Sequence, residues 1–297
     1  MPTNNEAERI IADKFSVGKS FVYKNDSNKI LLSGKPTYSS GEGKTDLYLK
    51  TQVKDGVTNE FKISIKKDNY EFLENKIKKD RAIEILGSSA LSIISTASKS
   101  LDDEIKKIKL VQIKKDGTYE ILLGWKLELF FNTTRKLKAS LNLSKTQKKE
   151  VLCGTHLPPI KKNATVCGQL IPDSGEANFI LEIPSSLNSL RALNINDLSA
   201  KFKTPDELIN SAEFDINAGF TALNYRSNKD KWDGPRPLAI WVNWQIVNNK
   251  LLPCIEYDTP LELDGNDVGY CLKKSLKFFK LGSCDCQKLL GLIVDQS

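Results

Sequence analysis

The chain has 297 residues, of which 40% are hydrophobic, and a formal net charge of +7, enough material for one large or two moderate globular domains. It contains no run of eighteen apolar residues, so no membrane-spanning helix is predicted. The first ten residues, MPTNNEAERI, are polar and acidic. They argue against a secretory signal peptide and predict a cytoplasmic protein of a bacterium, or of a host cell if the gene is phage-encoded.

The positive charge is concentrated in the first half of the chain. Residues 1–150 contain 29 Lys and Arg against 20 Asp and Glu, whereas residues 151–297 contain 15 against 17. Lysine makes flexible, salt-sensitive contacts to phosphate groups. The first half is therefore expected to dock on a nucleic acid, although a Lys-rich composition also occurs in soluble proteins that bind none.

Four elements are predicted in order near the amino terminus: a helix, a strand, a β-hairpin and a second helix. Their expected ranges are Asn5–Phe15, Lys29–Ser33, Thr45–Lys66 and Asn69–Leu86. Within the hairpin, residues 45–53 and 57–66 alternate apolar and polar side chains, as half-buried strands do. The connection Lys54-Asp55-Gly56 suits a three-residue turn in which Gly takes the left-handed position.

This turn determines which residues of the two strands face each other. If Val53 faces Val57, then Asp46 lies opposite Ser64, and one face of the hairpin is apolar while the other is polar. The polar face carries Asp46, Tyr48, Lys50, Glu60, Lys62, Ser64 and Lys66. A carboxylate, hydroxyls and several amines on one face suit metal-assisted chemistry on a phosphate.

With these residues the chain resembles the PD-(D/E)XK nuclease superfamily, which includes many type II restriction endonucleases. The family pattern places an acid on one strand and an acid-x-Lys triplet on the next. Glu60-Phe61-Lys62 matches the pattern literally, and Ser64-Ile65-Lys66 matches a variant with serine in place of the acid. The chain departs from the pattern before Asp46, where Thr45 replaces the family's proline.

Strand geometry favours the second triplet. Directly opposed residues have Cβ atoms ~5 Å apart, whereas Glu60 is four residues out of register with Asp46, roughly 13 Å along the strand. Mg²⁺ binds oxygen ligands at ~2.1 Å, so two ligands of one ion cannot be that far apart. Asp46, Ser64 and Lys66 are therefore the expected site, and the Glu60/Lys62 alternative stays open because a bulge could shift the register.

The resemblance implies a bound Mg²⁺ held by Asp46 and a second acid. In the serine-bearing variant the following helix supplies that acid, and its candidates here are Glu71, Glu74 and Asp80. Asp80 precedes Arg81, which is similar to the acid-Arg arrangement of that variant. The family's first helix also often supplies a glutamate, and Glu8 is the matching residue.

The rest of the chain is predicted to be mixed α/β. The predicted elements are a helical stretch at 87–108, a hairpin at Lys109–Phe131, a helix opened by Ser144-Lys145-Thr146-Gln147 and closed by Gly154, a helix at Thr204–Asn210, and strands at Leu238–Ile246, Leu251–Tyr257 and around Tyr270. The helix opening and the change of charge place a boundary near residue 145. The expected domains are a catalytic core at 1–145 and a region for DNA recognition or dimerisation at 146–297.

The six cysteines contain no CxxC pair and there is one histidine, His156, so neither a zinc site nor histidine-based catalysis is favoured. Residues 224–237 combine basic, amide and aromatic side chains in an expected loop. The candidate DNA contacts are Lys44 beside the Gly41–Gly43 loop, and Asn224, Arg226, Lys229, Lys231 and Arg236. The alternative for residues 224–237 is a surface loop anchored by Tyr225 and Trp232.

The sequence therefore predicts a mixed α/β protein with a central mixed β-sheet flanked by helices and a restriction-endonuclease-like core. The predicted function is Mg²⁺-dependent, sequence-specific cleavage of double-stranded DNA, with dimerisation as an expectation from the resemblance. The alternatives are a phage or repair nuclease without restriction specificity, and a non-catalytic DNA-binding protein.

Overall fold

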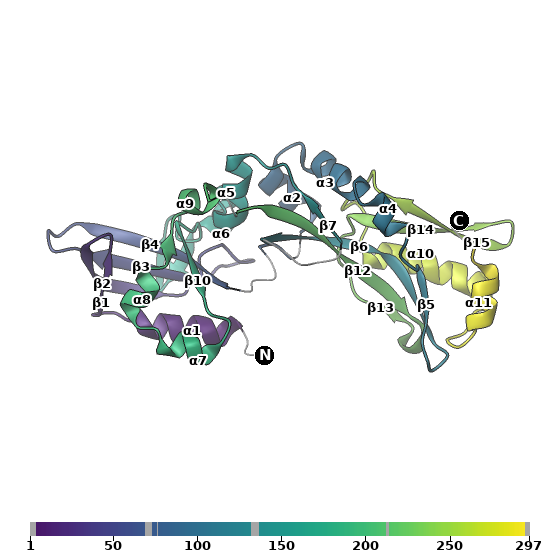
Figure 1. Cartoon of the computed structure of the whole chain (residues 1–297), viewed down its shortest axis with the longest axis horizontal. Coiled ribbons are helices and arrows are strands. Elements are labelled where there is room, and N and C mark those ends of the chain that lie inside the picture. The colour runs from purple at the N-terminus through teal and green to yellow at the C-terminus, as the bar shows by residue number, and fades with distance from the viewer. Residues whose placement is uncertain (1–3, 69–72, 76, 132–136, 212–213, 295–297) are drawn as a thin grey trace. The chain divides into compact units, whose positions relative to one another are not determined.

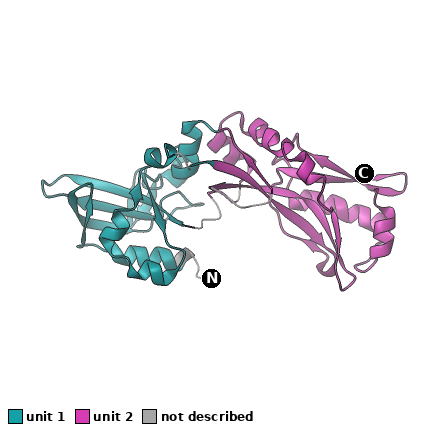
Figure 2. Cartoon of the chain, in the orientation of Figure 1, with its two compact units in different colours: residues 1–71, 143–215 teal, residues 72–142, 216–297 magenta. Residues whose placement is uncertain are grey.

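The computed structural model describes residues 4–68, 73–75, 77–131, 137–211 and 214–294. The chain forms two compact units, each built from two separate segments (Figure 2). Unit 1 comprises residues 1–71 and 143–215, and unit 2 comprises 72–142 and 216–297. This division differs from the expected contiguous domains 1–145 and 146–297, because the chain passes between the units three times.

Unit 1 is a mixed α/β unit (Figure 1). Its elements are α1 (Asn4–Lys14), β1 (Ser20–Tyr23), β2 (Asp26–Gly34), β3 (Leu47–Gln52), β4 (Thr58–Lys67), α5 (Lys145–Cys153), α6 (Pro159–Lys162), β8 (Ala164–Val166), β9 (Gln169–Ile171), β10 (Phe179–Ile183), α7 (Leu187–Ala192), α8 (Ile195–Ser199), β11 (Phe202–Lys203) and α9 (Pro205–Ile209). Six strands form one sheet in the order β1-β2-β3-β4-β10-β11. Neighbours are antiparallel except β4 and β10, which run parallel, so the predicted mixed sheet is confirmed.

The β3–β4 hairpin has the predicted register. Leu47 pairs with Ile63 and Lys50 with Glu60. The turn closes as expected, with the Val53 amide donating to the Val57 carbonyl at 2.9 Å and Gly56 at φ 82°. A slip of one residue would exchange the buried and exposed faces, so burial of the apolar face stabilises this register.

That apolar face forms the core of unit 1. Helices α1, α7 and α8 pack their apolar side chains against it. The fully buried core residues are Ala7, Ile11, Phe15, Phe21, Ile30, Leu47, Leu49, Phe61, Ile63, Leu181, Ile183, Leu190, Leu198 and Phe202. Each large apolar side chain contributes roughly 1.5–3 kcal/mol by leaving water, so this cluster holds the polar face of the hairpin in place.

Unit 2 has a second, antiparallel sheet with helices packed against it (Figure 1). Its elements are α2 (Lys79–Leu86), α3 (Ala90–Lys99), α4 (Asp102–Ile105), β5 (Val111–Ile113), β6 (Tyr119–Phe131), β7 (Lys138–Ser140), β12 (Ile216–Arg226), the 3₁₀ helix η1 (Ser227–Lys229), β13 (Lys231–Trp232), β14 (Ile240–Val247), β15 (Lys250–Glu256), α10 (Gly265–Phe278) and α11 (Cys286–Leu292). The long strands β6 and β12 pair along their length and lie at its centre. No helix of the described part of the chain is long and apolar enough to cross a membrane.

Several predicted elements are confirmed, and three need correction. The Ser144–Gln147 capping box opens α5, and Gly154 ends it in the left-handed conformation. The predicted helix 69–86 is shorter: α2 begins at Lys79, because Leu73 and Glu74 instead pair their backbones with Leu129 of β6.

The other two corrections concern strands that the sequence did not predict, among them β1, β10 and β12, and Tyr270, which lies in the helix α10 rather than in a strand. The excess of positive charge also follows the units rather than the halves of the chain. Unit 1 contains 20 Lys and Arg against 19 Asp and Glu, whereas unit 2 contains 24 against 18. The basic character therefore belongs mainly to the unit that does not contain the hairpin.

Candidate active site

Asp46 lies directly before β3, at the end of the ladder between β3 and β4. Its amide donates to the Ile63 carbonyl at 2.8 Å, while the paired residues of the ladder end at Leu47 and Ile63. The expected pairing of Asp46 with Ser64 is therefore not part of the ladder, although the two side chains approach each other. One carboxylate oxygen, Oδ2, accepts from the Ile65 amide at 2.7 Å and lies 3.5 Å from the Ser64 hydroxyl. The carboxylate thus serves as hydrogen-bond acceptor for the Ile65 amide in place of a β3 backbone carbonyl, and this fixes the Asp46 side chain against β4.

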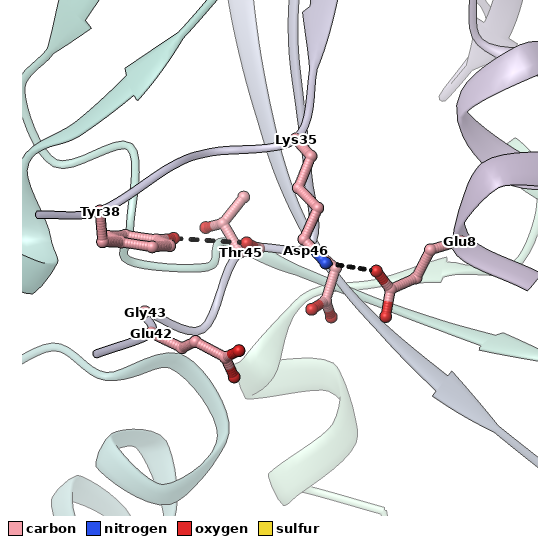
Figure 3. Close-up of a pocket in the computed structure, with 7 residues that line it drawn as sticks. All are labelled: Glu8, Lys35, Tyr38, Glu42, Gly43, Thr45 and Asp46. Carbon is pink, nitrogen blue, oxygen red and sulfur yellow. Dashed lines mark hydrogen bonds and ion pairs between the residues drawn. The ribbon is translucent and has the colours of Figure 1, made fainter. Parts of the chain in front are cut away.

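Beside Asp46 is a pocket of about 250 Å³ (Figure 3). The residues that line it come from α1 and from the segment between β2 and β3, and they are Glu8, Lys35, Tyr38, Glu42, Gly43, Thr45 and Asp46. The structure therefore brings together Asp46 and Glu8, which are far apart in sequence. Lys35, Tyr38, Glu42 and Thr45 are additional lining residues that the sequence analysis missed.

The charges in this pocket are three carboxylates and one nearby ammonium. Lys35 Nζ lies 2.6 Å from Glu8 Oε2, and in Figure 3 the Asp46 carboxylate lies next to this pair. Burial raises the pKa of Asp46, and the charge of Glu8 adds to that increase. Lys66, the Ile65 amide and Lys35 oppose it by lowering the pKa of Asp46. A cation bound beside Asp46 would relieve the same unfavourable burial of charge.

Thr45 offers an unused polar group at the same place. It is 3% exposed, and among the described residues its hydroxyl has no hydrogen-bond partner although it lines the pocket. A buried hydroxyl without a partner is destabilising by about 1–3 kcal/mol. Ser98 and Tyr48 share this condition elsewhere, but neither lines the pocket. A ligand that enters the pocket could satisfy Thr45.

The Gly41–Gly43 loop is held close to the rest of unit 1 rather than standing free. A Cβ on Gly43 would lie 2.6 Å from the Tyr38 hydroxyl and 2.8 Å from the Gly175 carbonyl oxygen. The same carbonyl accepts from the Lys44 amide at 2.8 Å. Gly43 is therefore needed for close packing of the pocket wall.

Lys66 occupies the same face of the sheet as Asp46 and Ser64. Its charge makes the largest of the contributions that lower the pKa of Asp46. In the parallel pairing of β4 with β10, Lys66 lies beside Glu182. Registered residues of neighbouring strands share a face, so Glu182 is a further acidic side chain of the polar face, after Asp46 and Glu60. The sequence analysis missed Glu182 because the pairing of β10 joins residues more than a hundred positions apart.

The alternative triplet lies farther along the hairpin. Glu60 pairs with Lys50, and its charge raises the pKa of Tyr48 after the larger effect of burial. Lys62 Nζ donates to the Asp173 carbonyl at 3.0 Å. Glu60 and Lys62 are therefore on the predicted face. Neither residue lines the pocket, and the same is true of Ser64 and Lys66, but only Ser64 and Lys66 act on Asp46.

Two of the acids proposed from the second helix belong to unit 2. Asp80 belongs to α2 of unit 2, and Glu74 of the same unit forms an ion pair of 2.7 Å with Arg81. Glu71 lies outside the described residues. The resemblance implied Asp80 as a metal ligand; Asp80 belongs to unit 2, and within unit 1 the acids that line the pocket with Asp46 are Glu8 and Glu42.

The candidate DNA contacts in the second half are partly corrected. The segment 224–237 is largely a hairpin of β12 and β13 rather than a loop, anchored by the buried Tyr225 and by Trp232. Arg226 is bound by two acids, with Nη1 2.7 Å from Glu120 and Nε 2.8 Å from Asp233. Its guanidinium is therefore engaged within unit 2 and is a poor candidate for reading a base.

The remaining candidates differ in exposure. Lys229, Lys231 and Arg236 are exposed, while Asn224 is half-buried and its backbone N–H donates to the Asp233 carboxylate at 3.0 Å. Lys44 is half-buried, and its charge lowers the pKa of Cys153, a thiol whose pKa burial raises to about 12. Lys44 therefore points toward α5 rather than into the pocket.

In the described ranges no group of three or more His, Cys, Asp or Glu side chains is arranged to hold a metal ion. The single histidine, His156, is exposed and lies with Nδ1 3.3 Å from Glu150. Comparison with protein-family models, with curated proteins and with solved structures found no match to the chain. The chemistry of the site therefore rests on its own residues.

Proposed function

We propose that the protein is a Mg²⁺-dependent endonuclease that cleaves double-stranded DNA at specific sequences, like a type II restriction enzyme of the PD-(D/E)XK type. The observation that carries this proposal is the placement of Asp46, Ser64 and Lys66 on one face of adjacent segments, beside a pocket that also contains Glu8. The order α1, β2 and the β3–β4 hairpin also agrees with the family core.

The donor set of the pocket fits a magnesium ion. Mg²⁺ is usually held by one or two carboxylates, with water and substrate phosphates as the other ligands. Asp46 and Glu8 would provide the carboxylates, and the Glu8–Lys35 ion pair would open to release Glu8. When bound, the ion would lower the pKa of a coordinated water and polarise the scissile phosphate.

The protein's own residues have separate tasks in this proposal. Ser64 and the Ile65 amide hold the Asp46 carboxylate in one orientation. Lys66 orients the attacking water or stabilises the charge of the pentavalent phosphate. The Thr45 hydroxyl donates to a phosphate oxygen that enters the pocket.

Incubation of plasmid DNA with the full chain, with Mg²⁺ and with EDTA, tests the proposal. Discrete bands that need Mg²⁺ support a restriction-like enzyme, and a smear supports a phage or repair nuclease without sequence specificity. The variants Asp46→Ala and Lys66→Ala should lose cleavage and keep DNA binding. A protein that shifts DNA without cutting it under any metal condition contradicts the proposal.

A non-catalytic DNA-binding protein is the second candidate, and one observation favours it. Lys35 already neutralises Glu8, and the described residues include no cluster of three metal-binding side chains. In that case Lys35 takes the place of a metal ion and preserves the fold of a former active site. Titration with Mg²⁺ by calorimetry separates the two candidates, because only the enzyme needs to bind the ion.

A further inference from the structure

The outer face of α10 in unit 2 carries exposed aromatic and basic side chains that have no role in the proposed cleavage site. The helix buries Val268, Leu272 and Leu276 against the sheet. Helical periodicity places the exposed residues together on the opposite face. Its central members are Tyr270, Lys274, Lys277 and Phe278.

Two large aromatic side chains on this face are exposed to solvent. Tyr270 is 61% exposed and Phe278 is 60% exposed. Each ring is supported by one neighbour, Tyr270 by Trp232 and Phe278 by Phe279, with 5.0 Å between ring centroids in both pairs. Trp232 is itself fixed by a hydrogen bond of 2.7 Å from its Nε1 to Asn266. The rings are eight residues apart, or ~12 Å along the helix.

The charged groups between these rings are positive. Lys274 and Lys277 are exposed, and among the described residues neither has an ion pair within 4 Å, although the charge of Lys277 contributes to lowering the pKa of Asp230. The neighbouring Lys273, by contrast, lies 2.5 Å from Asp230 and is neutralised. Unit 2 also carries most of the net positive charge of the chain. A polyanion that offers flat apolar groups would complement this face.

We infer that this face of α10 binds single-stranded nucleic acid, with unpaired bases stacked on Tyr270 and Phe278 and with phosphates held by Lys274 and Lys277. Aromatic platforms interleaved with cations are the usual means of binding a single strand without sequence preference. A duplex hides the faces of its bases, so it would use the lysines alone. This binding does not depend on cleavage at Asp46.

The test measures binding of the full chain to a fluorescein-labelled oligothymidylate of twenty residues, by anisotropy in EDTA at several salt concentrations. Tyr270→Ala should weaken binding about tenfold, within the range of one lost base stack. Lys274→Ala/Lys277→Ala should reduce the slope of log K against log salt by about 1.4, since each phosphate contact to a single strand contributes ~0.7. The matched control, Lys201→Ala/Lys203→Ala, removes two exposed lysines of unit 1 and should change neither quantity.

A second measurement locates the bases directly. An oligonucleotide with 5-bromodeoxyuridine should photocross-link to Tyr270 or Phe278, and mass spectrometry identifies the attached residue. Unchanged affinity in both α10 variants, an equal loss in the unit 1 control, or cross-links only outside α10 would each overturn the inference. Equally tight, Tyr270-dependent binding of polyglutamate or anionic vesicles would also refute it, by assigning the face to an acidic protein or a membrane. Thermal unfolding confirms that each variant is folded, and Asp46→Ala should bind like the wild type.

Discussion

Replacing Lys66 is the sharpest test of which lysine serves the site, because Lys62 is an internal control. Both lysines lie two residues from Ser64 on β4, so each is ~6.6 Å along the strand from the residue whose hydroxyl lies 3.5 Å from the Asp46 carboxylate. They differ in their contacts: Lys66 lowers the pKa of Asp46, whereas Lys62 donates to the Asp173 carbonyl at 3.0 Å. The two lysines are therefore equally far from Ser64 along the strand, and they differ in the groups on which they act.

Removing one group that stabilises a developing charge reduces kcat by about 10²–10³. We expect Lys66→Ala to show this loss in a Mg²⁺-dependent plasmid-cleavage assay, with DNA affinity in EDTA unchanged. Lys62→Ala should retain activity to within about threefold, because its amine donates to the Asp173 carbonyl and does not act on Asp46. A full loss in Lys62→Ala with an active Lys66→Ala would refute the assignment and favour the Glu60-Phe61-Lys62 triplet.

Three other variants probe the pocket and the fold. Burial raises the folded-state pKa of Asp46 above its unfolded value, so the contribution of Asp46 to folding stability is largest below the ordinary aspartate pKa and is lost as pH rises through the raised value. Asp46→Asn should remove this loss. Urea unfolding that shows the same wild-type-to-variant difference at every pH would contradict the prediction. Thr45→Val should raise the free energy of unfolding by about 1 kcal/mol, since it removes a buried hydroxyl without a hydrogen-bond partner, and it should reduce cleavage. A loss of stability would show that the hydroxyl already has a hydrogen-bond partner. Gly124→Ala should destabilise unit 2 by at least ~2 kcal/mol in thermal unfolding, because φ at Gly124 is 149° and a Cβ there would lie 2.3 Å from the Ile240 carbonyl oxygen. In the control variant Gly291→Ala the new Cβ meets no atom within 4 Å, so this variant should be neutral or more stable.

Local patterns in the sequence were sufficient for the hairpin and its surroundings. Alternation and the turn at Gly56 predicted the register of β3 and β4, because a shift by one residue would expose the apolar face. The Ser144 capping box likewise predicted where α5 begins. These features depend on residues within about twenty positions of one another, so a single sequence contains them.

Long-range pairing was not accessible from the same patterns. Glu182 reaches the polar face because β10 joins β4 in parallel after the intervening chain has formed part of unit 2. Lys35 lies in a connection without periodicity, and nothing in its sequence context indicates that it pairs with Glu8. The sequence also contains no sign that Glu120, over a hundred residues away, forms an ion pair with Arg226.

The interleaved order of the two units has a consequence for how the protein can be dissected genetically. Truncation after residue 145 would remove five of the fourteen fully buried side chains of the unit 1 core, together with the strand beside Lys66. Such a fragment cannot complete its core and should aggregate or be degraded. A soluble version of unit 1 alone would instead require residue 71 to be spliced to residue 143 by a short linker, with the central insert deleted and the chain ended at residue 215.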